Sequence, residues 1–314
     1  MSKILYDCII IGGGPAGLAA AIYAGRAELK TLRIEKGFPG GQVLNTYEVD
    51  NYPGLDGLDG TSLAMKFAEH SQKYGVEEVT AEVLRLEDMD APIKRVVTDK
   101  ETYETKTVIV ATGCGYRKLG VAGEKELTGH GVSYCATCDG GFFRGKDVVV
   151  VGGGDVAVED AIYLTRMCHH VYLVHRRDSL RAAGILSRQA MENEKITILW
   201  NTQVEKILGE NEVEGVQLRE NDKAESYCLE VAGAFIAVGM DPNSELLEPW
   251  VEMENGFVVC DDCMETSLPG VFAAGDIRVK PLRQIITAAA DGAVAISGVQ
   301  RYIDKMFTIY SKTV

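Results

Sequence analysis

The chain lacks the features that mark several special classes of protein. No apolar run approaches the ~20 residues that a membrane span needs, and Asp7 interrupts the apolar stretch near the start, so we expect neither a membrane segment nor a signal peptide. Eight cysteines in 314 residues are too sparse for a disulfide scaffold, which favours a reducing compartment. Positive charge is scarce, because the formal net charge is −14, and nucleic acid needs a basic surface. We therefore expect a cytoplasmic protein with no membrane or nucleic-acid partner.

The remaining composition is that of an ordinary globular protein. Hydrophobic residues make up 46% and charged residues 25% of the chain, and no low-complexity segment or long linker interrupts it. Because a typical domain has ~150 residues, the length predicts about two domains, each large enough for its own core.

A glycine-rich signature follows the first apolar run. Residues 12–17 read Gly-Gly-Gly-Pro-Ala-Gly, which matches G-x-G-x-x-G, and they come directly after the run Cys8–Ile11. Helix-forming residues follow, and Leu32–Ile34 returns as a second strand that ends in Glu35. A strand, a glycine turn, a helix and a strand ending in an acid together predict a βαβ unit that binds a dinucleotide.

Each glycine of this signature has a separate expected role. Gly12 allows the tight turn, Gly14 lets the backbone approach a pyrophosphate, and Gly17 permits close packing of the helix. The helix N-terminus attracts negative charge, and Glu35 is expected to accept the ribose hydroxyls. Since an acid at this position repels a 2′-phosphate, this unit is expected to bind a nucleotide with a free ribose.

The same design recurs in the middle of the chain. Residues 152–157 read Gly-Gly-Gly-Asp-Val-Ala, after an expected strand at Val148–Val151 and before an expected helix at Val158–Met167 and a returning strand at Val171–Val174. The positions that correspond to Gly12, Gly14, Gly17 and Glu35 are Gly152, Gly154, Ala157 and His175. The repeat predicts a second nucleotide-binding unit.

The second unit differs from the first at the position that is expected to contact the ribose of the nucleotide. It ends in His175-Arg176-Arg177, and Arg181 follows about one turn later. Three guanidinium groups suit a phosphate dianion, because each can bind it through two hydrogen bonds and stays charged at any working pH. We therefore expect this unit to bind NADPH; the alternative interpretation is a solvated basic turn.

A pair of cysteines lies between the two signatures, in Cys135-Ala-Thr-Cys138-Asp139. Two thiols separated by two residues can close a disulfide across one helical turn and exchange two electrons. The same spacing binds zinc when a second pair completes four ligands. The spacing alone leaves both interpretations open.

A second C-x-x-C, Cys260 and Cys263, lies too far along the chain from the first pair for an ordinary zinc-ribbon spacing. We interpret it as two loop or strand-end cysteines, with an auxiliary redox switch as the alternative. No metal site is expected.

These motifs together resemble those of the low-molecular-weight thioredoxin reductases, class II of the pyridine nucleotide-disulfide oxidoreductases. The resemblance spans nearly the whole chain. It rests on the following segments, in this order: Gly12-x-Gly14-x-x-Gly17, Gly40-Gly41-Gln42, Ala111-Thr112-Gly113, Cys135-Ala-Thr-Cys138-Asp139, Gly152-x-Gly154-x-x-Ala157, His175-Arg-Arg, Gly275-Asp276 and Arg283-Gln284.

The resemblance implies an α/β fold with two Rossmann-like domains, the second inserted in the first. Residues 1–113 and 244–314 would form a split FAD-binding domain, and residues 114–243 an NADPH-binding domain that carries the cysteine pair. The first domain would resume with a buried strand at Val271–Asp276 and a long helix over Arg283–Ile303. The resemblance also implies a homodimer whose domains rotate between two states.

The resemblance further implies an NADPH-dependent thioredoxin reductase. Electrons would pass from NADPH to FAD, then to the Cys135–Cys138 disulfide, and finally to the disulfide of thioredoxin. Cys138 would face the flavin, Cys135 would attack the partner, and Asp139 would protonate a leaving thiolate. A helix-capping role for Asp139 is the alternative.

The expected cofactor-binding residues fall into two sets. Those for FAD are Gly12, Gly14, Pro15, Ala16, Gly17, Glu35, Lys36, Gly41, Gln42, Asn51, Ala111, Thr112, Gly113, Gly275, Asp276, Arg283, Gln284 and Ile285. Those for NADPH are Gly152, Gly154, Asp155, Ala157, His175, Arg176, Arg177, Arg181 and Gly239.

Other functions remain open at this point. The chain could be a flavin-dependent disulfide reductase that uses ferredoxin, a dithiol oxidase that passes electrons to oxygen, or a reductase of another small dithiol protein. The arginine cluster disfavours the first two, which have no use for it. From a different class, the chain could be a nucleotide-responsive protein with a structural zinc ion.

Overall fold

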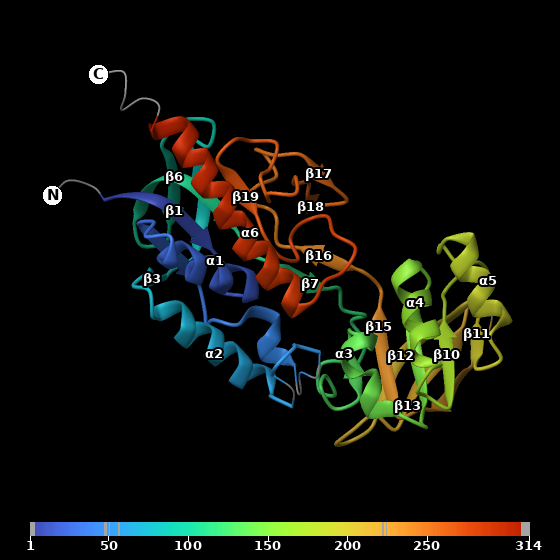
Figure 1. Cartoon of the computed structure of the whole chain (residues 1–314). Coiled ribbons are helices and arrows are strands. Elements are labelled where there is room, and N and C mark those ends of the chain that lie inside the picture. The colour runs from blue at the N-terminus through green and yellow to red at the C-terminus, as the bar shows by residue number, and fades with distance from the viewer. Residues whose placement is uncertain are drawn as a thin grey trace. The chain divides into compact units, whose positions relative to one another are not determined.

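The computed structural model describes residues 4–46, 49, 51–55, 57–221, 223 and 225–308. The chain divides into two compact units, which we call unit 1 (residues 1–115 and 241–314) and unit 2 (residues 116–240). Figure 1 labels the helices and strands of both units.

Unit 1 is built on a mixed sheet of seven strands among the described residues, in the order β3-β2-β1-β6-β5-β4, with β19 also paired to β6. Strands β1, β2, β3, β6 and β19 are parallel, whereas β4 and β5 pair antiparallel. The strands are β1 (Leu5–Ile11), β2 (Thr31–Glu35), β3 (Glu77–Thr80), β4 (Val83–Glu87), β5 (Lys94–Thr98), β6 (Thr102–Val110) and β19 (Val271–Ala273). Shorter strands are β7 (Cys114–Tyr116), β16 (Met240–Pro242), β17 (Met253–Glu254) and β18 (Phe257–Val258).

The helices of unit 1 cover the sheet because the strands are apolar on both faces. Along β1, Ile9 and Ile11 enter one buried cluster, whereas Cys8 and Ile10 enter another that includes alanines of α1 and α6. Helix α1 has proline at its first position, where the missing N–H costs no hydrogen bond. The helices are α1 (Pro15–Arg26), α2 (Gly60–Gln72), α6 (Ile285–Ile303) and the short turns η1 (Gly41–Asn45) and η3 (Asp304–Thr308).

Unit 2 contains a five-stranded parallel sheet, in the order β11-β10-β9-β15-β8, and a separate antiparallel sheet, β12-β13-β14. The strands are β8 (Val132–Ser133), β9 (Asp147–Gly152), β10 (His170–Val174), β11 (Ile196–Leu199), β12 (Thr202–Leu208), β13 (Gly215–Glu220), β14 (Ser226–Glu230) and β15 (Gly233–Ala237). The helices are α3 (Ala136–Asp139), α4 (Asp155–Leu164), α5 (Gly184–Glu192) and the turn η2 (Gly140–Phe143).

The strand registers of the two units repeat each other. Ile11 of β1 pairs with Ile34 of β2, and Val151 of β9 pairs with Val174 of β10. Each unit therefore starts from the same parallel strand–turn–helix–strand arrangement, which confirms the predicted α/β class with two Rossmann-like units.

Several predicted boundaries differ by a few residues. Helix α4 ends at Leu164 rather than Met167, because the N–H groups of Arg166 and Met167 donate to carbonyls only three residues back, those of Tyr163 and Leu164, both at 3.1 Å. Strand β19 ends at Ala273, before the predicted Asp276, and α6 starts at Ile285 because its N-cap Gln284 is extended. Within the described part of the chain, no helix is long and apolar enough to cross a membrane.

Candidate active site

Cys135 and Cys138 are joined by a disulfide, with their Cα atoms 5.3 Å apart. Cys135 is the N-cap of α3, and its carbonyl accepts hydrogen bonds from the N–H groups of Cys138 and Asp139 at 3.3 and 3.1 Å. Both cysteines are partly exposed. The one-turn helix thus presents a disulfide that an outside thiol can reach.

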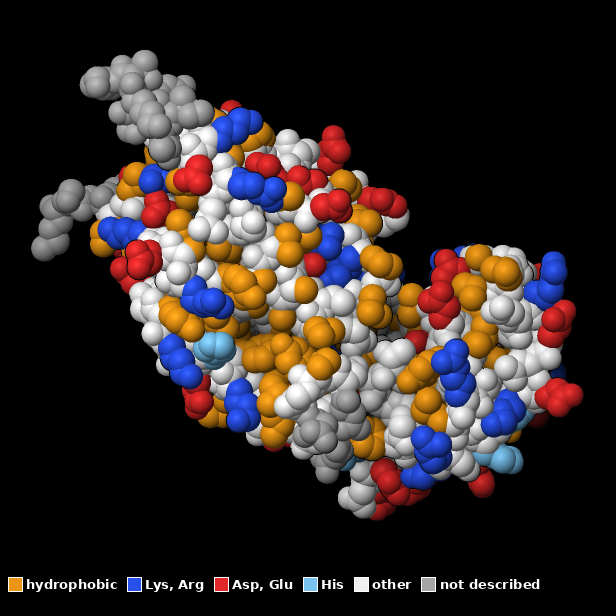
Figure 2. Space-filling model, in the orientation of Figure 1, with side chains coloured by type: hydrophobic (Ala, Val, Ile, Leu, Met, Phe, Trp, Pro, Cys, Tyr) orange, Lys and Arg blue, Asp and Glu red, His pale blue; other side chains and the backbone are white. Residues whose placement is uncertain are grey.

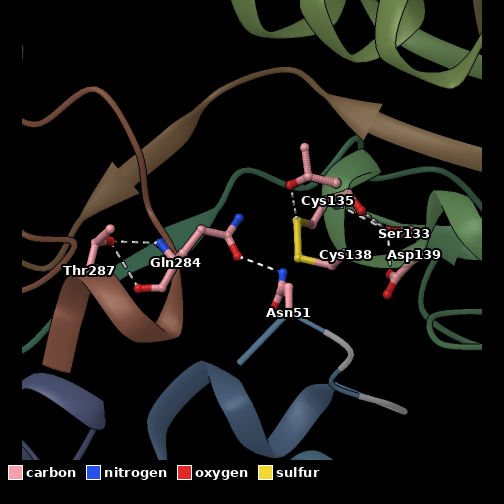
Figure 3. Close-up of a disulfide and its surroundings, with 8 residues drawn as sticks. Asn51, Ser133, Cys135, Cys138, Asp139, Gln284 and Thr287 are labelled. Atoms are coloured by element: carbon pink, nitrogen blue, oxygen red, sulfur yellow. Dashed lines mark hydrogen bonds between the residues drawn. A yellow bond between two sulfur atoms is a disulfide. The ribbon is translucent and has the colours of Figure 1, made fainter. Parts of the chain in front are cut away.

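Asp139 lies beside this disulfide and is held by Ser133 (Figure 3). The Ser133 hydroxyl donates to Asp139 Oδ2 at 2.6 Å, and the Cys135 N–H donates to the same hydroxyl oxygen at 3.0 Å. Burial raises the pKa of Asp139, and the hydrogen bond from Ser133 partly opposes that rise. The side chain makes no capping hydrogen bond in η2, of which Asp139 is the N-cap. The carboxyl group is therefore placed to keep a proton near the sulfurs.

Tyr134, which directly precedes Cys135, is fixed on several sides. Its hydroxyl donates to Glu124 Oε1 at 2.8 Å, its ring stacks on Tyr116 at 5.4 Å, and Lys118 Nζ lies 3.7 Å from the ring centroid. Sequence reasoning missed these residues, and their spacing gives no motif that could have revealed them. Together they fix the backbone that enters the disulfide.

The glycine-rich turn of unit 1 uses its glycines in two ways. A Cβ on Gly12 would lie 2.3 Å from the Ala111 carbonyl oxygen, and a Cβ on Gly17 would lie 2.1 Å from that of Gly12. A Cβ on Gly14, in contrast, would meet nothing within 4 Å. Gly12 and Gly17 are therefore required by packing, whereas the space at Gly14 is open to a ligand.

Loops that are distant in sequence meet at this turn. The Gly40 N–H donates to the Gly13 carbonyl at 2.7 Å, and a Cβ on Gly41 would lie 3.2 Å from the Gly14 Cα. Glu35 Oε2 accepts from the Gly13 N–H at 2.6 Å, and Oε1 accepts from the Gly37 N–H at 2.9 Å. The acid at the end of β2 thus lies against the turn, as the spacing suggests.

The predicted residues Lys36, Gln42 and Asn51 lie in different surroundings. Lys36 is exposed and its Nζ lies 4.0 Å from a Glu82 oxygen. Gln42 Nε2 donates to the Cys114 carbonyl at 3.2 Å. Asn51 Nδ2 donates to Gln284 Oε1 at 3.0 Å, which joins this loop to the start of α6 (Figure 3).

Asn243 holds the segment 111–113 through hydrogen bonds. The Thr112 hydroxyl donates to the Asn243 carbonyl at 2.6 Å, and Asn243 Nδ2 donates back to the Thr112 carbonyl at 2.8 Å. The Asn243 N–H also donates to the Gly113 carbonyl at 3.0 Å. These bonds hold the segment after β6 in a fixed turn.

Asp276 carries the clearest sign of a ligand in unit 1. Within the described residues, its Oδ1 is buried and has no hydrogen-bond partner. Burial raises the pKa of Asp276, while Lys280 and Arg283 act to lower it. A Cβ on the preceding Gly275 would lie 2.9 Å from Ala16 Cβ, so this loop sits tightly on the start of α1. A buried acceptor at this point fits a ligand that brings a hydroxyl group.

The start of α6 lies in the same region. Gln284 and Thr287 form a reciprocal capping box, and Ile285 is the first helical residue. Arg283 Nε donates a hydrogen bond to the Asp276 carbonyl oxygen at 3.4 Å. The helix N-terminus and two cations therefore border the Asp276 loop, an environment that favours an anionic ligand.

The turn of unit 2 follows the same plan. A Cβ on Gly152 would lie 2.4 Å from the Ala237 carbonyl oxygen, whereas one on Gly154 would meet nothing within 4 Å. Ala157 is fully buried, so the helix stands far enough from the turn for a methyl group. Asp155 Oδ1 accepts from the Ala183 N–H at 2.7 Å. Here too the middle glycine faces open space.

The basic residues of unit 2 lie next to that turn. The Arg181 N–H donates to the Gly153 carbonyl at 2.7 Å, and Arg176, Arg177 and Arg181 are exposed. His175 is buried, its Nε2 has no partner among the described residues, and burial lowers its pKa, with Arg181 and Arg177 acting in the same direction. A neutral histidine and three exposed guanidinium groups, which can bind a phosphate, fit a ribose that carries a 2′-phosphate.

Gly239 lies near the end of unit 2, shortly after β15. It has φ +122, a conformation that favours glycine, and its carbonyl accepts from the Arg117 N–H at 3.0 Å. Two residues earlier, Ala237 ends β15 and pairs with Gly152, so Gly239 follows the strand that borders the second glycine turn.

The second cysteine pair is not bonded. Cys260 and Cys263 are free thiols, and Cys260 Sγ points at the carbonyls of Ala273 and Val258, 3.8 and 4.0 Å away. Burial raises the pKa of Cys260 to about 12. In the described part of the chain, no group of histidines, cysteines and acids could hold a metal ion. The geometry agrees with two structural cysteines.

Sequence reasoning also missed a buried ionic cluster in unit 1, formed by Asp291 with Arg278 and Lys280. The available signal was Asp291 itself, an acid in the otherwise apolar run 285–299. A charged residue inside such a run is rarely buried without a partner.

Comparisons with known proteins agree with this geometry. The pyridine nucleotide-disulphide oxidoreductase family matches residues 6–292. A thioredoxin reductase of Bacillus subtilis (strain 168) is 48% identical over 304 residues, which cover 96% of each chain. The crystal structure of thioredoxin reductase from Streptococcus pyogenes MGAS5005 matches with a TM-score of 0.92 at 46% identity, over 97% of this chain and 100% of that one. Lactococcus lactis thioredoxin reductase matches with a TM-score of 0.66 at 43% identity, over 96% and 100%. The chain therefore belongs to the pyridine nucleotide-disulphide oxidoreductase family, within which it groups with the thioredoxin reductases.

Proposed function

We propose that this protein is an NADPH-dependent thioredoxin reductase that reduces its client through the Cys135–Cys138 disulfide. The observation that carries the proposal is the partly exposed disulfide, held on a one-turn helix beside a half-buried acid whose pKa is raised. The family to which the chain belongs uses FAD and NADPH. When bound, these cofactors together supply the two electrons that open the disulfide.

Unit 1 fits FAD. The open space at Gly14 would admit a pyrophosphate, and the unpartnered Asp276 Oδ1 would accept a hydroxyl of the ribityl chain. Glu35 would turn toward the adenosine ribose, and the other FAD residues predicted from the sequence remain part of this proposal. We therefore assign the split domain, residues 1–113 and 244–314, to FAD.

Unit 2 fits NADPH. The open space at Gly154 would admit the pyrophosphate, and the exposed Arg176, Arg177 and Arg181 would bind the 2′-phosphate. His175, at the position that Glu35 has in unit 1, carries no negative charge to repel that phosphate. We therefore assign residues 114–243 to NADPH. A ferredoxin-dependent enzyme would have no need of the arginines.

The reduced pair would act on thioredoxin by disulfide exchange. The Cys135 thiolate attacks one sulfur of the client disulfide, forming a mixed disulfide and releasing the other client sulfur as a thiolate. Asp139 gives that thiolate a proton, which its raised pKa allows it to carry at higher pH than an exposed aspartate. The Cys138 thiolate then attacks Cys135 Sγ, which restores the Cys135–Cys138 disulfide and releases the second client sulfur as a thiolate that takes a proton from solvent.

The experiment that tests this function compares electron donors in one assay. Holoenzyme and oxidised thioredoxin are mixed with NADPH, NADH or reduced ferredoxin, and the thiols formed on thioredoxin are counted. We expect efficient turnover with NADPH alone, and none with Cys138→Ser and NADPH. Turnover driven by ferredoxin but not by NADPH, or a fully active Cys138→Ser enzyme, would contradict the proposal.

We also propose that the protein is a cytoplasmic homodimer. Six of its eight cysteines are free, which suits a reducing compartment. Figure 2 shows hydrophobic side chains gathered over the part of unit 1 where α1, α2 and α6 lie in Figure 1. Tyr23, Met65 and Val294 on these helices are 46%, 58% and 37% exposed. An apolar surface on three packed helices favours association with a second copy.

Light scattering after size-exclusion chromatography tests the dimer. We expect a mass of two chains for the wild type and of one chain for Met65→Glu, whose charge would be buried in the interface. Leu84→Glu is the matched control, because Leu84 is 53% exposed on strand β4, away from these helices. A wild-type mass of one chain would rule out the dimer. If Met65→Glu still had a mass of two chains, the interface would not include Met65.

A further inference from the structure

Asp291 is a buried acid in the middle of α6, with a side chain that is 9% exposed. Its Oδ2 accepts hydrogen bonds from the Gly275 N–H at 3.1 Å, from Arg278 Nε at 2.9 Å and from Lys280 Nζ at 2.8 Å. Its Oδ1 accepts from Arg278 Nη2 at 3.1 Å. One carboxylate thus binds three points along the segment 275–280.

The helix that carries Asp291 cannot easily shift. A Cβ on the next residue, Gly292, would lie 2.0 Å from the Ala16 carbonyl oxygen, so α6 crosses α1 there in direct backbone contact. A Cβ on Gly275 would lie 2.9 Å from Ala16 Cβ. Asp291 therefore connects the segment 275–280 to a rigid crossing, directly beside the glycine-rich turn.

Lys280 lies between two carboxylates. Its Nζ is 2.8 Å from Asp291 Oδ2 and 3.9 Å from Asp276 Oδ1, and its side chain is only 4% exposed. Asp276 Oδ1 has no hydrogen-bond partner within the described residues. The ammonium group thus donates its hydrogen bond to Asp291 and makes only a longer ion pair with Asp276, whose Oδ1 stays without a hydrogen bond from any described residue.

We propose that Asp291 is a positioning residue of the FAD site, which holds Lys280 and Arg278 so that Asp276 keeps a free acceptor oxygen for a ligand hydroxyl. The inference rests on the proposed binding of FAD to unit 1. Without the charge of Asp291, Lys280 would move the short distance to Asp276 and occupy the oxygen that the ligand needs. Asp291 itself would not touch the ligand.

The ionisation of the two acids agrees with this division of roles. Burial acts to raise the pKa of Asp291, but the hydrogen bonds from Arg278 and Lys280 outweigh it, so the pKa lies below the usual range. Burial dominates at Asp276, whose pKa is raised. The cations therefore act mainly on Asp291.

A double-mutant cycle tests the proposal. The FAD dissociation constant is measured by flavin fluorescence on apoprotein of the wild type, Asp291→Asn, Lys280→Gln and the double variant. We expect Asp291→Asn to raise the dissociation constant about tenfold, the effect of losing one hydrogen bond to a charged group. We expect the double variant to recover most of that loss, because no ammonium group remains to occupy Asp276.

Each result decides between this role and a structural one. Unchanged FAD binding by Asp291→Asn contradicts the proposal, as does a double variant that binds FAD no better than Asp291→Asn. Apoprotein of Asp291→Asn that loses its cooperative melting transition also contradicts it, since the expected effect is confined to residues 275–280. Wild-type protein that binds no FAD would instead refute the assignment of unit 1.

Discussion

Replacing Gly14 with alanine separates ligand binding from folding at the first glycine turn. Gly14 has φ −75, which any residue adopts, and a Cβ there would meet nothing within 4 Å. Alanine is a poorer N-cap than glycine, which destabilises the folded protein by up to ~1 kcal/mol. Alanine also lowers the conformational entropy of the unfolded chain, which stabilises the folded protein by ~0.4–1 kcal/mol. Because these effects oppose each other, the free energy of unfolding of the apoprotein should stay within about 1 kcal/mol of wild type.

The same variant should bind FAD poorly. In the proposed site the pyrophosphate occupies the space that the new methyl group fills, and overpacking of this kind costs about 1–3 kcal/mol. The FAD dissociation constant should therefore rise by roughly 5- to 150-fold. Flavin fluorescence titration measures binding, and thermal melting of the apoprotein measures folding.

Gly17→Ala is the matched control. Its Cβ would lie 2.1 Å from the Gly12 carbonyl oxygen, so α1 must move away from β1. We expect a lower melting temperature of the apoprotein, by contrast with Gly14→Ala. If Gly14→Ala bound FAD as tightly as wild type, or lost stability as Gly17→Ala does, the assignment of open space to the cofactor would be wrong.

Three further predictions concern other sites. Asp139→Asn should lower turnover with thioredoxin by about 10²- to 10⁴-fold, the usual contribution of a general acid. Turnover should fall as the pH rises and Asp139 loses its proton. Ser133→Ala removes a hydrogen bond that lowers the pKa of Asp139, so this variant should lose activity at higher pH than the wild type. Replacing Arg176 and Arg177 with alanine should raise KM for NADPH at least tenfold and leave KM for NADH nearly unchanged; equal changes would refute the phosphate role. Cys260→Ser should keep wild-type turnover but lower the melting temperature, and lost turnover would point to a redox role.

Much of the fold was predictable because its elements repeat a local pattern. The apolar strand, the glycine turn and the helix occur at matching positions in both units, and Ile11 and Val151 have equivalent pairings. The roles of individual glycines were harder to predict. Gly17 and Ala157 occupy the same position, yet a Cβ on Gly17 would clash with the Gly12 carbonyl oxygen, whereas unit 2 buries the Ala157 methyl group beside Gly152.

The contacts that support the site could not be predicted in the same way. Asp291 meets Arg278 and Lys280 through a helix crossing, and Ser133 meets Asp139 because β8 ends beside the start of α3. The Asp291 contacts depend on the tertiary arrangement, whereas Ser133 and Asp139 are only six residues apart but meet through the turn between β8 and α3, for which the sequence gives no motif. An isolated acid in an apolar helix was the one sign that the sequence offered.

Cys135 and Cys138 are proposed to receive the electrons of NADPH. Holoenzyme is treated with an alkylating reagent under denaturing conditions, before and after anaerobic addition of NADPH, and the labelled cysteines are identified by mass spectrometry. We expect both to be unlabelled before NADPH is added and labelled afterwards. If NADPH leaves both unlabelled in protein that contains FAD, the proposed electron path is contradicted.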